Sequence, residues 1–261
     1  MDTVASQAQI RSVAREAAVK VPEVTAAFWV TKVLTTGMGE TASDFLFHNL
    51  SHVIALAIGI VGFAASLVLQ SRARRYVPWI YWLAVVMVSV FGTMAADVAH
   101  VALGVPYTAS TAFFIVVLGV IFAWWYAKER TLSIHSITTR PRERFYWATV
   151  LATFALGTAV GDLTAKTLNW GYLSSAVLFA AVIVIPLVAH RWLRLNAIIA
   201  FWFAYIVTRP LGASFSDWFA YSTPHWGNGP ITVVLTVAII GLVGYMTAAD
   251  RKGARADEQL V

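Results

Sequence analysis

The sequence predicts an all-α polytopic membrane protein, with eight transmembrane helices forming four parallel two-helix repeats in a pseudo-fourfold arrangement. Hydrophobic residues make up 59% of the 261 residues and charged residues only 12%, about half the charged fraction of a soluble domain. The pattern Trp-x9-Gly-x3-small-Asp also occurs four times without an insertion. Its copies end at Asp44, Asp97, Asp162 and Asp217.

Eight hydrophobic segments are each long enough to cross a hydrocarbon layer of about 30 Å. We expect them at residues 24–48, 52–70, 77–102, 108–127, 145–168, 172–189, 196–222 and 230–248. Two segments make one unit, which predicts repeats at 23–76, 77–143, 144–195 and 196–249, between tails at 1–22 and 250–261. Because each unit holds an even number of spans, all four units enter the membrane from the same side as parallel repeats.

The basic residues indicate the orientation. Sixteen of the nineteen Lys and Arg fall outside the expected spans, all on one side. By the positive-inside rule, both termini and the three longer connections are cytoplasmic. The net charge of +6 is therefore a topology signal, and the expected partner is the lipid bilayer, with no nucleic acid. The absence of cysteine excludes disulfides and thiolate metal sites.

The repeated motif predicts how the first helices of the units pack. Each Trp lies near a cytoplasmic helix end, where an amphipathic ring suits the headgroup level. The Asp follows fifteen residues later, about 22 Å along the helix. The Gly and the small residue four positions on form a face that allows close helix approach. We therefore expect tightly packed motif helices that hold four carboxylates at one depth, facing a shared interior.

Facing carboxylates in a low dielectric must share protons, bind a cation or pair with basic groups. If repeats one and four are neighbours, as a closed ring requires, Glu40 and Arg209 would form a buried pair. The alternative is that Arg209 satisfies Asp217, or backbone carbonyls freed by a kink at Pro210.

Two further lysines lie inside the expected spans. Lys32 is expected to snorkel toward the cytoplasmic surface. Lys166 stands one turn after Asp162 on the same helix, which favours a local ion pair.

Hydroxyl and imidazole groups accompany the carboxylates. Thr93 and Thr158 follow their motif glycines and could ligate a cation or carry protons, or could simply bond their own helix carbonyls. His48 and His100 lie near the motif aspartates, and mixed carboxylate and imidazole ligands suit a bound divalent cation such as Zn or Mn. The alternative is that these histidines are only solvated.

The four motif copies, the GETASD start, the RPLGASFSD sequence of the fourth copy and the Gly-Tyr after the third resemble a bacterial membrane-anchored protein family. That family has four tandem repeats of two transmembrane helices, each with a signature Trp. The resemblance covers about residues 21–248. It implies the eight-span repeat fold and a location in the bacterial inner membrane, and it implies no particular activity.

Intramembrane acids are functional by default, so the favoured hypothesis is a cation transporter or channel, proton-coupled and taking a divalent metal among its candidate substrates. The alternative is a non-transport scaffold or receptor in which the aspartates cross-link helices. An enzyme is not expected, since the chain shows no Gly-x-Gly-Asp, nucleophile elbow, HExxH or nucleotide loop. The sequence leaves homo-oligomerisation and the identity of the ion open.

Overall fold

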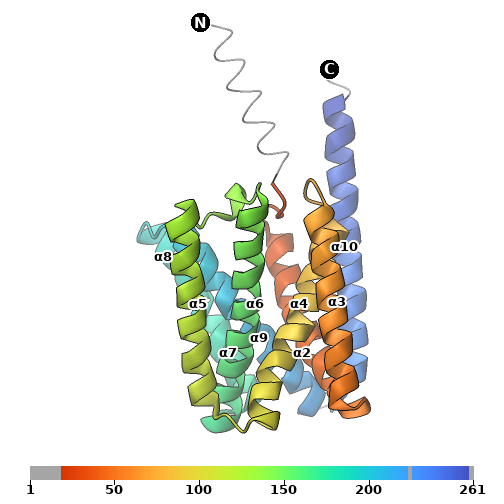
Figure 1. Cartoon of the computed structure of the whole chain (residues 1–261), viewed down its shortest axis with the longest axis vertical. Helices are drawn as coiled ribbons and strands as arrows, with labels where there is room; N and C mark the ends of the chain where they lie inside the picture. Colours follow the sequence, from red (N-terminus) through yellow and green to blue (C-terminus); the bar gives the residue numbers. More distant parts are fainter. Residues whose placement is uncertain (1–18, 223–224, 259–261) are drawn as a thin grey trace, which may run out of the picture.

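The computed structural model describes residues 19–222 and 225–258, which form a bundle of upright helices (Figure 1). The first half comprises α2 (Ala26–Asn49), α3 (His52–Arg72), α4 (Pro78–Asp97) with its π-helical extension η1 (Val98–Ala102), and α5 (Tyr107–Glu129). The second half comprises η2 (Ile134–Ser136), α6 (Arg140–Asp162) with its extension η3 (Leu163–Thr167), α7 (Gly171–Val182), α8 (Val184–Trp192), α9 (Ala197–Tyr221) and α10 (Asn228–Glu258). The described part contains no strand.

Within the described residues, seven helical segments are long and apolar enough to cross a membrane. They are His52–Arg72, Pro78–His100, Tyr107–Glu129, Arg140–Thr167, Gly171–Trp192, Ala197–Tyr221 and Asn228–Asp250. The eighth expected span is α2, a helix of 24 residues whose charged side chains Lys32 and Glu40 are buried inside the bundle. The chain is therefore an all-helical, multi-pass membrane protein.

The helix ends differ from the expected ones in three places. α6 begins at Arg140 rather than at 145, because the Thr139 side chain caps it by accepting from the Arg142 N–H, and Pro141 suits its first turn. The sixth span is broken between α7 and α8 at residue 183, since Pro186 lacks the N–H that would continue the helix. α10 continues to residue 258, into the expected C-terminal tail, and the expected N-terminal tail lies outside the described residues as far as residue 18.

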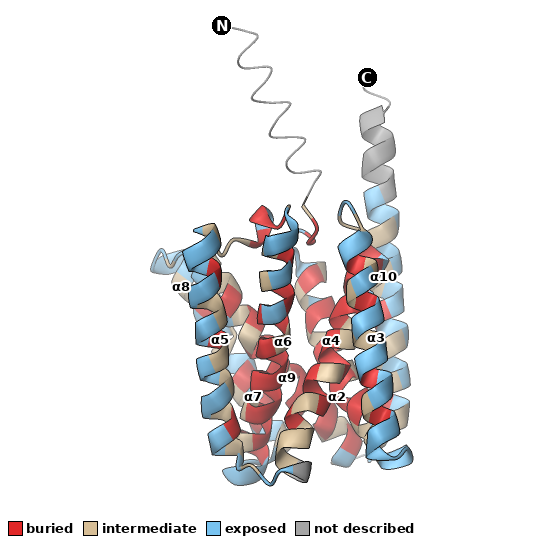
Figure 2. Cartoon of the chain, in the orientation of Figure 1, coloured by how far each residue is buried: buried red, intermediate tan, exposed pale blue. Residues whose placement is uncertain are grey.

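The four motif helices α2, α4, α6 and α9 contact one another in chain order, and α9 closes back onto α2. Each outer helix packs on the motif helix of the next unit: α3 on α4, α5 on α6, α7 on α9 and α10 on α2. Figure 2 shows the consequence, with the motif helices largely buried and the outer helices largely exposed. A fourfold rotation between the units stays a prediction, since these contacts establish the order of the units and not the angles between them.

An aromatic layer closes the ring near the end that carries the basic loops, which we call the basic end. The residue before each signature Trp is aromatic and contacts the signature Trp of the next unit. The ring centroids of these pairs lie 5.7 Å apart for Phe28–Trp82, 5.7 Å for Tyr81–Trp147, 6.1 Å for Tyr146–Trp202 and 5.6 Å for Phe201–Trp29.

Three of the four signature tryptophans are buried in this layer and do not face the lipid headgroups, whereas the fourth, Trp29, is partly buried. Trp82, Trp147 and Trp202 are only 1%, 6% and 4% exposed. Each of these indoles packs against an aromatic ring on the motif helix of the preceding unit, and the large apolar area that a buried aromatic ring contributes outweighs the interfacial preference of an isolated Trp.

The motif glycines make the next layer of contacts, and here the expectation of close helix approach is confirmed. A Cβ added to any of the four would overlap a neighbouring helix. The residue met is each time the one three positions before the glycine of the next unit. The pairs are Gly39 with Ser89, Gly92 with Phe154, Gly157 with Arg209, and Gly212 with Thr36.

Candidate functional site

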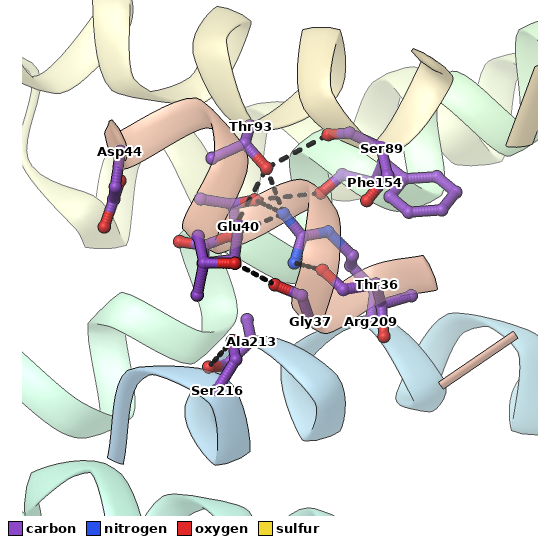
Figure 3. Close-up of polar contacts among 12 residues, drawn as sticks. Thr36, Gly37, Glu40, Asp44, Ser89, Thr93, Phe154, Arg209, Ala213 and Ser216 are labelled. Carbon is purple, nitrogen blue, oxygen red and sulfur yellow. Dashed lines mark hydrogen bonds and ion pairs between the residues drawn. The ribbon is translucent and has the colours of Figure 1, made fainter. Parts of the chain in front are cut away.

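A polar cluster lies on the axis of the ring, one residue beyond the glycine layer (Figure 3). Glu40, Thr93 and Thr158 each directly follow the motif glycine of their own unit. Because the glycines bring α2, α4 and α6 together, these three side chains meet at the axis. The fourth unit has Ala213 at this position and supplies Arg209 from one turn earlier on α9.

Arg209 joins all four motif helices. Its Nη2 donates to Glu40 Oε2 at 2.6 Å, to Thr158 Oγ1 at 2.8 Å and to Thr93 Oγ1. Its Nη1 donates to the Thr36 carbonyl at 3.3 Å. Arg209 is 0% exposed and Glu40 4%. The predicted Glu40–Arg209 pair is thus confirmed, and Asp217 is not the partner of the guanidinium.

Thr93 and Thr158 both accept from the Arg209 guanidinium, so the cation that they contact is part of the protein. Each hydroxyl also lies within bonding distance of a carbonyl of its own helix, Ser89 O at 3.1 Å for Thr93 and Phe154 O at 3.2 Å for Thr158. The own-helix hydrogen bonds foreseen for a membrane threonine are therefore present, next to the bonds from Arg209. Binding of an external ion by these hydroxyls stays a prediction.

Lys32 does not snorkel; it is 0% exposed. It stands seven residues, or about two turns, before Gly39, so both side-chain positions face the interior of the ring. Its Nζ lies 4.1 Å from the ring centroid of Phe154 and 4.2 Å from that of Tyr205, and it has no hydrogen-bond partner among the described residues. Two aromatic faces therefore replace the water that a lysine ammonium ordinarily holds.

The motif aspartates lie beyond the Arg209 cluster, toward the end opposite the basic one. Asp44 follows Glu40 by one turn on α2, and Figure 3 shows it pointing away from the guanidinium. Asp44, Asp162 and Glu40 act as neighbouring negative charges on both Asp97 and Asp217, and Lys166 acts on both as a positive one. The carboxylates thus lie within electrostatic reach of one another, as the shared motif position predicts.

The four aspartates differ in their partners. Asp44 accepts from Tyr221 at 2.6 Å and from Asn228 at 3.5 Å. Asp162 forms the predicted ion pair with Lys166 at 2.9 Å, and the lysine side chain is 47% exposed. Asp217 is 5% exposed and its Oδ1 has no partner among the described residues. Asp97 forms no side-chain hydrogen bond or ion pair in the same part of the chain.

The candidate metal ligands do not gather. No group of three or more His, Cys, Asp or Glu side chains suited to a metal ion occurs in the described part of the chain. His48 is exposed and its Nδ1 lies 2.7 Å from the Asp44 carbonyl. His100 places its Nδ1 2.8 Å from the Val105 carbonyl and its Nε2 3.3 Å from Ser110 Oγ. Each imidazole thus lies against protein groups, and a divalent site built on these residues stays a prediction.

Four tandem segments match one family model, described as Repeat of Unknown Function (DUF347): residues 27–76, 80–131, 145–196 and 200–252. The matched segments together cover well over half of the chain. The chain belongs to this family. Neither the comparison with curated proteins nor that with solved structures gave a match. Each DUF347 segment contains one motif helix and the outer helix that follows it, which confirms the four tandem two-helix repeats.

Sequence reasoning missed two features that the DUF347 repeats carry. One is the aromatic residue before each signature Trp, which is visible once the four copies are aligned. The other is the shared register of Thr36 and Arg209, each three positions before its glycine, and of Lys32 and Tyr205, each seven before. Comparing the copies column by column exposes positions where one unit carries a charge and its counterparts do not.

Proposed function

We propose that the protein is a membrane carrier for a small cation, in which protons and the cation exchange on the motif aspartates. The observation that carries this proposal is the delivery of four carboxylates, one from each motif helix, to one end of the ring. Ionisable groups within a membrane-spanning helix are energetically costly, and they mark ion or proton pathways in membrane proteins.

The four motif aspartates, which we call the acidic cluster, have an excess of negative charge. Of its four carboxylates, Asp162 alone has an ion pair among the described residues, and that partner, Lys166, is half exposed. Asp97 and Asp217 have Glu40, Asp44 and Asp162 as neighbouring negative charges and Lys166 as a single positive one. Like charges in a low dielectric cannot all stay ionised and unneutralised, so protons or a bound cation supply the missing positive charge.

The centre of the ring favours a carrier over an open channel. Arg209 places a fixed positive charge on the axis, and a fixed positive charge in a pore repels cations. Passage therefore requires that the Glu40–Arg209 pair separate. Protonation of Glu40, or a cation that competes for its carboxylate, would release Arg209, and the small-residue faces would let the motif helices move past one another.

Reconstituted proteoliposomes with a trapped pH-sensitive dye test the proposal. Na⁺, K⁺, Mn²⁺ and tetraphenylphosphonium are each offered against a proton gradient, and the proton flux and cation uptake are measured. We expect Asp97→Asn and Asp217→Asn to lower the flux at least about tenfold, which corresponds to roughly 1.4 kcal/mol on the rate-limiting step. Asp250→Asn is the matched control, since Asp250 is exposed at the far end of the TM segment of α10.

Wild-type protein that moves none of these ions, or two Asn variants that transport as well as wild type, would refute the carrier. An Mn²⁺ flux that exceeds those of the monovalent ions would favour the divalent substrate.

A second candidate function is a non-transport scaffold or receptor, and one observation favours it. Tyr221 and Asn228 both donate to Asp44, which ties α2 to α9 and α10 as a structural cross-link would. If the protein is a scaffold, Tyr221→Phe should lower the melting temperature in detergent, and neither the wild type nor the variant should show an ion flux. A carrier predicts that the same variant alters flux with the fold intact.

A further inference from the structure

A groove of about 470 Å³ opens at the basic end between α3 and α6. Its mouth is lined by the guanidinium-bearing residues Arg72, Arg140 and Arg144. Its inner wall is apolar and includes Phe63, Leu67 and Leu151. The groove thus combines a cationic mouth with a hydrophobic interior. It lies at the end of the bundle opposite the motif aspartates.

The charge of the mouth is not cancelled by the protein. Glu143 also lines the groove, but its carboxylate already accepts from Lys20 at 2.7 Å and from Gln70 at 3.4 Å. No carboxylate of the described chain forms an ion pair with any of the three arginines, whereas Arg142, on the same turn of α6, pairs with Glu129 at 2.7 Å. Three positive charges are therefore left to face an outside ligand.

The depth of the groove fits one membrane leaflet. Arg72 is the last residue of one segment long enough to cross a membrane and Arg140 the first of another, which places the arginines at or just outside the boundary of the hydrocarbon layer. Along the helices, Phe63 lies about 13 Å inward from Arg72 and Leu151 about 16 Å inward from Arg140. Half of a hydrocarbon core of about 30 Å is about 15 Å. The apolar wall is thus about as long as an acyl chain that extends from a headgroup to the bilayer centre.

We propose that this groove binds an anionic phospholipid, with its phosphate on the three arginines and an acyl chain along the apolar wall. Guanidinium groups suit phosphate because their N–H donors match the geometry of two phosphate oxygens. Basic pockets between transmembrane helices on the positively charged side of a membrane protein are the usual site of such lipids. The inference is independent of transport, because the groove lies at the other end from the aspartates.

Native mass spectrometry of the full chain, released from nanodiscs into detergent, tests the proposal. The nanodiscs hold either phosphatidylglycerol or phosphatidylcholine. We expect retained phosphatidylglycerol on wild type and little phosphatidylcholine. The triple variant Arg72→Gln, Arg140→Gln, Arg144→Gln should lower the binding constant for phosphatidylglycerol roughly 100-fold, at about 1 kcal/mol for each arginine near the membrane surface.

A second triple variant with the same change in net charge is the matched control. Arg130 directly follows α5, Arg191 lies in the last turn of α8 and Arg194 follows α8, and none of the three lines the groove. Their replacement by Gln should leave the bound lipid unchanged. Ala148→Trp fills the groove from an exposed position while keeping every arginine, so it should release the lipid without unfolding the protein.

Three results would overturn the proposal. Equal retention of phosphatidylglycerol and phosphatidylcholine would show that charge does not select the lipid. Equal loss in both triple variants would show a diffuse electrostatic attraction and no site. Displacement of the lipid by glycerol phosphate at equal concentration, together with an unaffected Ala148→Trp variant, would assign the arginines to a free phosphate ligand.

Discussion

Replacing Arg209 by Met removes the group that holds the four motif helices to one another. The guanidinium is completely buried and donates to three side chains and one carbonyl. Without it, the Glu40 carboxylate stays 4% exposed and keeps only the Thr93 hydroxyl, at 3.3 Å, as a donor among the described side chains. Removing one partner of a buried ion pair costs about 3–5 kcal/mol, so we expect Arg209→Met to lower the unfolding free energy by that amount.

The double variant Glu40→Met with Arg209→Met distinguishes the cost of leaving one buried charge unpaired from the net contribution of the ion pair. Exchanging both charges for apolar side chains of similar volume is often neutral or stabilising, and both threonines keep a carbonyl acceptor on their own helices. The double variant should therefore be more stable than Arg209→Met alone by at least about 2 kcal/mol. It also keeps the test usable if the single variant fails to fold.

The assay is reversible unfolding in mixed micelles at increasing dodecyl sulfate, followed by tryptophan fluorescence. Lys128→Met is the control, because that lysine is exposed and forms no ion pair among the described residues, and an exposed charge contributes at most about 1 kcal/mol. The reasoning fails if Arg209→Met unfolds within about 1 kcal/mol of wild type, or if the double variant loses the sum of the two single losses.

Three further variants test the layers around this cluster by the same unfolding assay. Gly157→Ala should cost about 1–3 kcal/mol because its Cβ overlaps the neighbouring motif helix, whereas Gly119→Ala has open space and should be neutral or stabilising; equal effects would contradict the close approach. Lys32→Met should leave stability equal or higher, because the buried ammonium has no hydrogen-bond partner among the described residues; a loss above about 2 kcal/mol would show that its contacts with the aromatic rings dominate. Trp202→Phe removes the indole hydrogen bond to the Leu132 carbonyl, at 2.9 Å, and should cost about 1–2 kcal/mol; an unchanged midpoint would show that the bond contributes nothing.

The membrane fold and the repeat could be predicted because both are written in local patterns. A run of apolar residues must cross a hydrocarbon layer whatever surrounds it, and a tandem motif with constant spacing must produce similar helices. The Glu40–Arg209 pair was also within reach, because a ring of four units makes the first and last neighbours. The ion pair of Lys166 with Asp162 could be predicted from a single helix, since side chains four residues apart on a helix are neighbours.

The environments of Lys32 and of the signature tryptophans were predicted wrongly for one reason. Each was judged as a single side chain at an assumed depth, where a lysine snorkels and an indole prefers the headgroups. Their actual surroundings come from other repeats: Lys32 lies against Phe154 and Tyr205 of the third and fourth repeats, and Trp82 against Phe28 of the first. The position of a residue along a helix predicts its depth in the membrane, but it does not predict which face of the helix another helix covers.

The sequence by itself determined the class of protein, the four units and the residues that carry charge into the membrane. Only the tertiary structure decided which of those charges neutralise one another: Arg209 meets Glu40, while Asp97 and one oxygen of Asp217 are left without a partner among the described residues. The physical reason is that the energy of a buried charge depends on neighbours a few ångströms away. Those neighbours come from helices that are far apart in the chain and meet only when the ring closes.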